Sequence, residues 1–282
     1  MIIPKLAIRN LLGAGLRTWL NVTVLSFAFV AIIFSQGFNS GILEQASRAM
    51  IDSEIAGGQY WQANYDPYDP FTLEDAHAQI PAELKELLNT GQAAAILISQ
   101  GTIYPEGRII PVLLKGIDPP QKVLNIPSRF LAPKQDDIPA LIGSRMAMSA
   151  NLRIGDVVTV RWRDANGIFD ARDATIVQIM NTSVPTIDNG QIWLPLQTFQ
   201  KMAGMPNEAT LIVVEKNFVS PPQVSGWDFK NLNFLLKDLH ELIRTRTIAR
   251  SIFYAILLFL AMIAIFDTQV LAVFRRRKEI GT

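Results

Sequence analysis

The hydrophobic positions gather in two blocks near the ends of the chain. Residues 18–43 carry no charge, and residues 251–274 carry only one, Asp267. As an α-helix rising ~1.5 Å per residue, the second block would be ~36 Å long, enough to cross a ~30 Å hydrocarbon core. The first block exceeds the apolar core of a signal peptide, about 7 to 15 residues, and no small-residue cleavage pattern follows it. The pattern therefore predicts two retained transmembrane helices, with a signal peptide as the alternative for the first.

Helical periodicity extends beyond both blocks toward the middle of the chain, over residues 44–55 and 231–250. We expect Gly57-Gly58 to end the first of these extensions. Between these two stalks, short apolar runs alternate with Gly- and Pro-rich turns, which favours a mixed α+β domain of five to seven strands and three or four short helices. Ser144 is a candidate helix cap. We expect strands at 59–65, 93–104, 109–117, 157–162, 174–180, 191–194 and 210–215, the second and third joined as a hairpin through Pro105-Glu106-Gly107. We expect helices at 80–89, at 121–125, after Gly143 within the segment 140–152, and at 195–204.

Charge separates the ends of the chain from its middle. Residues 1–17 read as a short amphipathic helix with Lys5, Arg9 and Arg17 and no acid, a net charge of +3. Residues 275–282 begin with four cations and also carry +3, which leaves 19 basic and 24 acidic residues between, a net −5. Because basic segments stay on the cytoplasmic side during insertion, we expect both termini inside a bacterial inner membrane and the middle outside.

Candidate chemistry is sparse. The two histidines, His77 and His240, lie far apart, and Asp66 and Asp69 each precede a proline, which is typical of turns. The pair Asp136 and Asp137 lies in a Pro-flanked loop, and we expect it to face solvent. There is no cysteine, phosphate-binding loop or nucleophile motif, so we predict no catalytic, cofactor-binding or metal-binding residue. The acidic middle disfavours nucleic acid as a partner.

Asp267 is the one acid within an apolar block, which makes it a candidate functional residue. It precedes Arg275 by eight residues, ~12 Å along a helix. A polar contact between helices, a position near the inner interface and a proton relay all fit this placement.

Three motifs resemble one family. The N-terminal LAIRNLL with Arg17-Thr18, the outer segments GIDP and IGS with IGDVV, and the exit RKEIG occur in this order. They are similar to the FtsX-like permeases of ABC transporters, the group of the macrolide exporter MacB and the lipoprotein-releasing LolC/LolE. The resemblance implies a membrane protein with two transmembrane helices flanking a MacB-type periplasmic core domain. Its parts would be an amphipathic helix at 1–17, spans at 18–43 and 251–274, an outer domain with stalk at 44–230, a stalk helix at 231–250 and a coupling loop from 275–282.

The resemblance also implies partners and a role. ATP would be bound by a separate cytoplasmic ATPase, and this chain would move a periplasmic domain for export or for release of lipoprotein or envelope substrates. The further partners are a second copy or a related permease, membrane lipid, and a periplasmic adaptor or substrate protein. Such permeases have four spans, so ending at Thr282 predicts a fragment or a split gene product. The residues expected to couple to the ATPase, unless they only anchor the chain, are Arg9, Arg17, Arg275, Arg276, Arg277, Lys278, Glu279 and Ile280.

Two other classes place an outer domain between two spans. A polysaccharide chain-length regulator would show long heptad-rich outer helices and a Pro-rich second span, whereas the outer region here favours strands and residues 251–274 contain no proline. An extracytoplasmic sensor would need a signalling module after the second span. Association with an ATPase separates the transporter from both.

Overall fold

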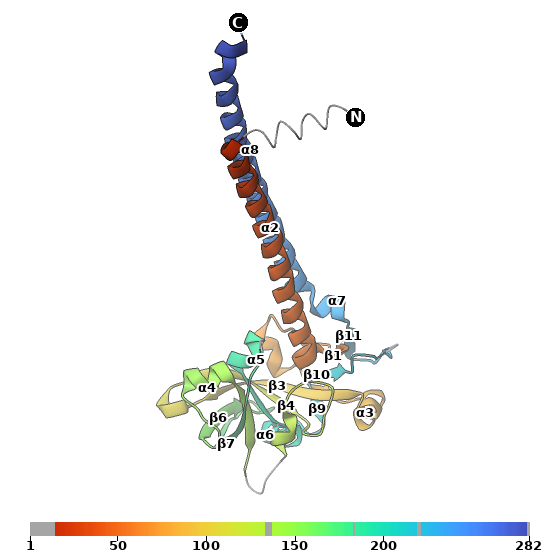
Figure 1. Cartoon of the computed structure of the whole chain (residues 1–282). Helices are drawn as coiled ribbons and strands as arrows, with labels where there is room; N and C mark the ends of the chain where they lie inside the picture. Colours follow the sequence, from red (N-terminus) through yellow and green to blue (C-terminus); the bar gives the residue numbers. More distant parts are fainter. Residues whose placement is uncertain (1–14, 133–136, 183, 219–220, 281–282) are drawn as a thin grey trace. The chain divides into compact units, whose positions relative to one another are not determined.

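The computed structural model of the protein describes residues 15–132, 137–182, 184–218 and 221–280. These residues belong to two compact units. One unit runs from the N-terminal end of the chain to Gln45 and from Asp238 to the C-terminal end, and it contains most of the two long helices. The other unit is the domain Ala46–Lys237 (Figure 1).

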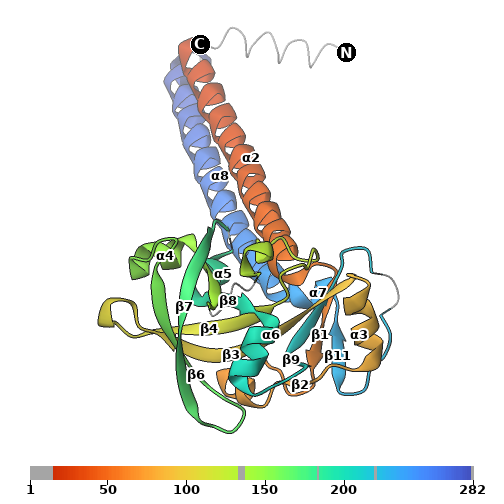
Figure 2. The same ribbon diagram turned by 90° about the horizontal axis from the view of Figure 1, so that it is seen from below.

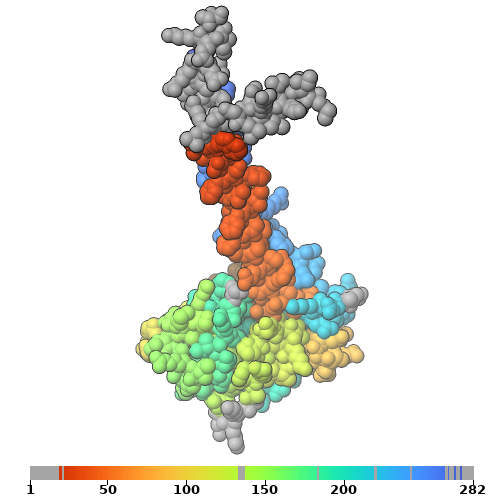
Figure 3. All heavy atoms as spheres, in the orientation of Figure 1, coloured from red at the N-terminus to blue at the C-terminus, as the bar shows by residue number. Residues whose placement is uncertain are grey.

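In the helical unit, α2 (Gly15–Met50) and α8 (Lys237–Ile280) run antiparallel, side by side (Figure 2). Their half-buried positions recur every three, four or seven residues, as in a helix pair with one narrow contact seam. On α2 these include Ile32, Ser35 and Asn39, and on α8 they include Arg250, Tyr254 and Ala261. Most other apolar side chains are exposed, and the surface of α2 lies open along the helix in the space-filling view (Figure 3). Both helices are long and apolar enough to cross a membrane, by length and composition.

The last turn of α2 belongs to the domain and continues into a π-helix, η1 (Ile51–Ile55). The amide of Ala56 donates to the carbonyl of Ile51 at 2.7 Å, the five-residue spacing of a π-turn. The helix then ends because Ala56 adopts a positive φ of 49° and because the chain passes very close to Glu215. A Cβ at Gly57 would lie 1.9 Å from the carbonyl oxygen of Glu215. The predicted stop at Gly57-Gly58 is confirmed.

Most of the domain is built on one nine-stranded sheet with the order β11-β1-β10-β3-β4-β8-β5-β7-β6. Its strands are β1 (Gly58–Gln62), β3 (Ala93–Ile103), β4 (Ile110–Ile117), β5 (Pro139–Gly143), β6 (Val157–Arg163), β7 (Phe169–Met180), β8 (Gln191–Pro195), β10 (Leu211–Val214) and β11 (Trp227–Lys230). A two-stranded sheet pairs β2 (Ala78–Gln79) with β9 (Glu208–Ala209). The α-helices of the domain are α3 (Ala82–Asn89), α4 (Ser144–Ala150), α5 (Pro185–Gly190), α6 (Leu196–Ala203) and α7 (Leu232–Leu235), and its 3₁₀-helices are η2 (Pro70–Glu74), η3 (Pro105–Gly107) and η4 (Ser128–Leu131).

The long strand β3 closes part of this sheet into a ring. Its first half, Ala93–Ile96, pairs with β10, and its second half, Gly101–Ile103, pairs with β6 on the same edge. The other edge of β3 pairs with β4. Strands β3, β4, β8, β5, β7 and β6 therefore form a closed barrel, while β10, β1 and β11 extend from it as an open sheet. Closure removes the free edges that would otherwise be exposed.

Alternate residues of the strands face two separate cores, as the pleat of a sheet requires. Ile192 and Leu194 of β8 lie in one apolar cluster with Leu114 and Ile142. Trp193, between them, lies in the other cluster with residues of η4 and the loop before it.

The predicted α+β class is confirmed, but several elements differ from expectation. The structure has eleven strands in the described residues, more than the predicted five to seven, because four short strands, β2, β5, β9 and β11, were not predicted. The predicted helix 121–125 is wrong, since the side chain of Gln121 instead closes a turn by accepting from the amide of Leu124 at 2.9 Å. The predicted cap Ser144 is also wrong: the N-cap is Gly143, and Ser144 donates to Asp188 at 3.0 Å.

Candidate functional site

Two neighbouring strands connect the domain to the long helices. β1 follows η1 directly, and β11 directly precedes α7 and α8. These strands, far apart in sequence, pair antiparallel from Gln59–Lys230 to Gln62–Trp227 (Figure 2). β1 also pairs with β10, which pairs with β3 of the barrel. A force applied through either connection would therefore reach the same hydrogen-bonded ladder.

An aromatic cluster joins the two connecting strands through their side chains. The ring of Trp61 on β1 meets the ring of Phe234 on α7 edge-on, with centroids 5.8 Å apart, and the ring of Tyr65 at 5.1 Å. The ammonium of Lys230 on β11 lies 5.7 Å from the Trp61 centroid and 5.1 Å from that of Phe234. Asn231 caps α7 by accepting from the amide of Phe234 at 2.9 Å. These contacts bind the start of the outgoing helical segment to β1.

Two tyrosine hydroxyls near this cluster are held in the neutral form. Burial raises the pKa of Tyr60 to about 12, and its hydroxyl donates to the carbonyl of Pro222 at 3.0 Å. Burial first, and then the charges of Glu54 and Asp66, raise the pKa of Tyr65. Both groups therefore act as uncharged packing and hydrogen-bonding groups throughout the physiological pH range.

A buried ion pair ties η1 to the barrel. The ammonium of Lys115 on β4 lies 3.0 Å from a carboxylate oxygen of Glu54, and the two side chains are 6% and 25% exposed. The same ammonium lies 5.2 Å from the centroid of the Trp193 ring. Gln59 of β1 donates to the carbonyl of Glu54 at 2.8 Å and accepts from the indole of Trp61 at 2.6 Å. The π-helix, the first strand and the barrel thus share one polar network.

The outer side of η1 is held by weaker contacts. The carboxylate of Asp52 pairs with Lys216 at 2.5 Å, and both side chains are well exposed. The carbonyl of Asp52 accepts from the amide of Asn125 at 2.7 Å. Beside these residues lies a cleft of about 380 Å³, with Ser53 on one side and Gln178 and Thr182 at the end of β7 on another. Its mixed polar lining offers no charge cluster, and no group of acidic or His residues in the described part of the chain could hold a metal ion.

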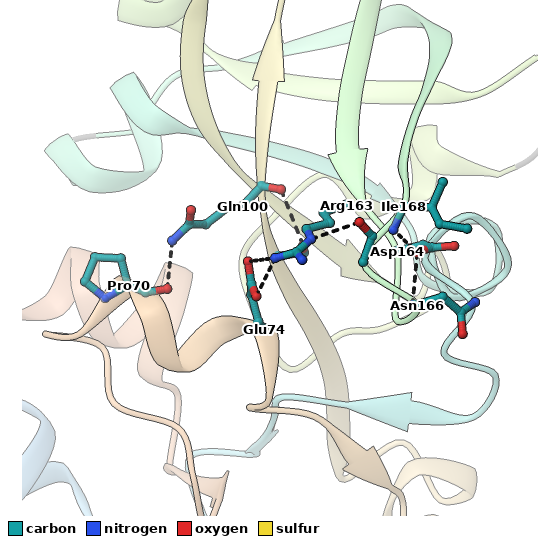
Figure 4. Close-up of polar contacts among 9 residues, drawn as sticks. Pro70, Glu74, Gln100, Arg163, Asp164, Asn166 and Ile168 are labelled. Atoms are coloured by element: carbon teal, nitrogen blue, oxygen red, sulfur yellow. Dashed lines mark hydrogen bonds and ion pairs between the residues drawn. The ribbon is translucent and has the colours of Figure 1, made fainter.

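A second polar cluster lies where the β6–β7 hairpin meets η2 (Figure 4). Nη1 of Arg163 lies 2.7 Å from both carboxylate oxygens of Glu74, and Nε of the same guanidinium donates to the carbonyl of Gly167 at 3.1 Å. The carboxylate of Asp164 accepts from the amides of Asn166 and Ile168. These charged groups bind one another or the backbone, so the arrangement fastens the hairpin rather than presenting reactive groups.

The predicted coupling residues are not tested by this structure. Arg9 lies outside the described residues. Arg17 belongs to α2, and Asp267 and residues 275–280 belong to α8, but the structure does not describe their side chains. Asp136 also lies outside them.

The remaining candidate residues have structural roles where they are described. His77 pairs with Glu208 across β2 and β9. Asp66 and Asp69 accept from the amides of Tyr68 and Phe71, which confirms the predicted turns. Asp137 is not simply solvent-facing, because it accepts from the hydroxyl of Thr175 at 2.6 Å.

Sequence analysis missed the pairing of Glu54 with Lys115. One signal was present: Lys115 is the only charge in the apolar run from Ile109 to Ile117. A lysine inside a buried strand needs a partner, because lysine is rarely fully buried unless paired. The pattern could not identify the partner, which lies 61 residues earlier in the chain.

The fold of the domain and its connections to α2 and α8 define a class of protein in which an α+β domain is inserted between two long apolar helices. The family model for the MacB-like periplasmic core domain matches residues 18–226, and the chain belongs to this family. The resemblance to MacB/FtsX-like permeases is thereby confirmed. Members are membrane-embedded permease components of ABC transporters that work with an ATPase. The family match supports the transporter over the regulator and the sensor.

Among solved structures, the chain is similar to the extracellular domain of YknZ, a noncanonic ABC-type transporter from Gram-positive bacteria. The two are 14% identical, the match covers 58% of this chain and 84% of that one, and the TM-score is 0.34. No curated protein matches the chain.

Proposed function

We propose that this protein transmits motion, as the permease of an ABC transporter whose ATP is hydrolysed by a separate cytoplasmic subunit. In this proposal α2 and α8 cross the inner membrane, both chain ends lie in the cytoplasm, and the domain lies in the periplasm. The apolar blocks and the basic ends support this orientation. The observation that carries the proposal is the direct pairing of β1 with β11, the strands that connect to the two helices.

The physical argument concerns how a displacement of α2 would reach the barrel. A helix end held only by surface contacts would slide, because exposed ion pairs such as Asp52–Lys216 contribute about 1 kcal/mol or less. Glu54 and Lys115 are held more firmly, since separating them leaves a charge in a site with little access to water. A push or twist on α2 would therefore move β4 together with β1.

The proposed contact with the ATPase involves Arg9, Arg17 and residues 275–280, which would lie at the inner ends of the helices. Their charge also fits simple anchoring in the membrane, so the two roles need separate tests. Under anchoring, Arg277→Lys and Glu279→Ala should both be silent. Under coupling, Glu279→Ala should weaken retention of the ATPase during purification, while Arg277→Lys retains it.

The substrates and remaining partners are proposed from the family alone. A second permease copy or a related permease would complete the complex, and an envelope substrate such as a lipoprotein would be moved outside the membrane. A periplasmic adaptor is the remaining proposed partner. Asp267 would lie within the second span.

The decisive experiment purifies the protein from its native membrane and identifies the chains that remain bound. The expected result is a co-purifying ABC ATPase, and its activity after reconstitution in lipid vesicles should depend on the Glu54–Lys115 pair. Lys115→Met should lower transport per ATP hydrolysed, while Arg163→Met, a change of the same type in the exposed hairpin pair, should not. Recovery of the protein without any ATPase would contradict the proposal and favour a two-span regulator or sensor.

A further inference from the structure

A polar contact joins the two long helices of the helical unit within their apolar segments. The hydroxyl of Tyr254 on α8 lies 2.8 Å from the hydroxyl of Ser35 on α2. One turn further along α2, the side-chain amide of Asn39 donates to the carbonyl of Ser35 at 2.6 Å and lies 3.5 Å from its hydroxyl. All three side chains are half-buried in the seam. We propose that Ser35 and Tyr254 are positioning residues that fix the register of α2 against α8.

The surroundings explain why this contact would select one register. The residues around it are apolar and mostly exposed, including Phe34 and Phe38 on α2 and Phe253 on α8. Apolar side chains of this kind pack nearly as well after a slide of one helical turn, because a hydrocarbon environment offers no hydrophobic penalty for the change. A hydroxyl in the same environment has no water to replace its lost partner. Only the observed register lets both hydroxyls bond to each other.

The inference rests on the proposed function, in which both helices cross the membrane and transmit motion. Two helices that hold one register move together along their axes, so a displacement of either reaches β1 and β11 at once. Two helices free to slide past each other would lose part of the displacement between them. The Ser35–Tyr254 contact would therefore act on coupling through helix position, without touching ATP or substrate.

The register can be measured by disulfide cross-linking, because the protein has no cysteine of its own. Ala28 precedes Ser35 on α2 by seven residues, or two turns, and Ala261 follows Tyr254 on α8 by the same number. Because the helices are antiparallel, the two steps lead in the same direction in space. The observed register therefore places Ala28 opposite Ala261. A slide by one turn would place Ala28 opposite Leu257. The double variants Ala28→Cys/Ala261→Cys and Ala28→Cys/Leu257→Cys report the two registers in the full chain in native membranes.

With Ser35 and Tyr254 intact, the first cysteine pair should cross-link more than the second. Tyr254→Phe and Ser35→Ala should each shift the ratio of the two yields toward the slid register by about threefold, the average effect of an interhelical hydrogen bond in a membrane. Ser35→Thr keeps a hydroxyl and should preserve the original ratio. Ser40→Ala, at an exposed position of the same helix, is the matched control and should also preserve it.

An unchanged ratio in both Tyr254→Phe and Ser35→Ala would overturn the inference, as would preferential cross-linking to position 257 in the otherwise unchanged protein. The measurement needs no ATPase. Its failure is therefore distinct from failure of the proposed function, which would appear as the absence of a bound ATPase.

Discussion

Two ion pairs in the domain join similar groups in very different settings. Glu54 and Lys115 lie where η1 meets the barrel, and the ammonium-bearing side chain is 6% exposed. Glu74 and Arg163 lie at the β6–β7 hairpin, where both side chains are about half exposed. The hairpin pair has the shorter separation, 2.7 Å against 3.0 Å. Burial rather than distance should decide their importance, because water screens the exposed pair and replaces lost contacts. The region that connects to the long helices should therefore be far less tolerant of change than the hairpin.

The largest effect is expected at the tight backbone approach beside η1. Gly57→Ala would place a Cβ 1.9 Å from the carbonyl oxygen of Glu215, so the backbone must move. We expect a loss of more than about 3 kcal/mol in the free energy of unfolding, or failure to fold. Thermal unfolding of the full chain in detergent measures this. Gly190→Ala is the control, because its added methyl meets no atom within 4 Å, and equal unfolding temperatures for both variants would refute the tight approach.

The second effect concerns the buried pair itself. Lys115→Met removes one charge and leaves Glu54 poorly solvated, which should cost about 3 kcal/mol, the lower end of the range for breaking buried pairs. The double variant Glu54→Gln/Lys115→Met should recover much of this loss, since no charge is then left unpaired. Denaturant unfolding of the single and double variants gives the coupling energy. Simple additivity of the single effects would show that the pair is not coupled.

The hairpin pair provides the contrast and a smaller effect. Arg163→Met should lower the free energy of unfolding by less than about 1 kcal/mol, because Glu74 remains in contact with water. The same denaturant unfolding experiment applies. A loss as large as that of Lys115→Met would overturn the argument from burial.

The smallest effect depends on pH. Burial raises the pKa of Asp118, at the turn after β4, above its ordinary value of 3.8. The folded protein therefore binds this proton more tightly than the unfolded chain, so the stabilising contribution is complete below pH 3.8 and is lost as pH rises through the folded pKa. Asp118→Asn should raise the unfolding temperature slightly at pH 7 and have less effect near pH 4. A difference that grows toward acid would contradict the direction of the shift.

Some contacts around the candidate site can be predicted from the sequence, and others cannot. The β3–β4 hairpin followed from two apolar runs around Pro105 and Gly107, because neighbours in sequence form it. The end of the helix at Gly57 followed from two adjacent glycines. The pairing of β1 with β11 did not, because β11 is only four residues long and its partner lies far away in the chain. The π-turn in η1 was not predicted either.

By itself, the sequence determined the two apolar blocks, the basic chain ends, the α+β character of the middle and the resemblance to the permease family. These are properties of composition and short-range periodicity, which each segment carries alone. Only the tertiary structure decided that β3 closes a barrel through β6, that the two connecting strands are neighbours and that Lys115 meets Glu54. Such pairings depend on how distant segments satisfy each other's hydrogen bonds and charges, and any one segment is compatible with many partners.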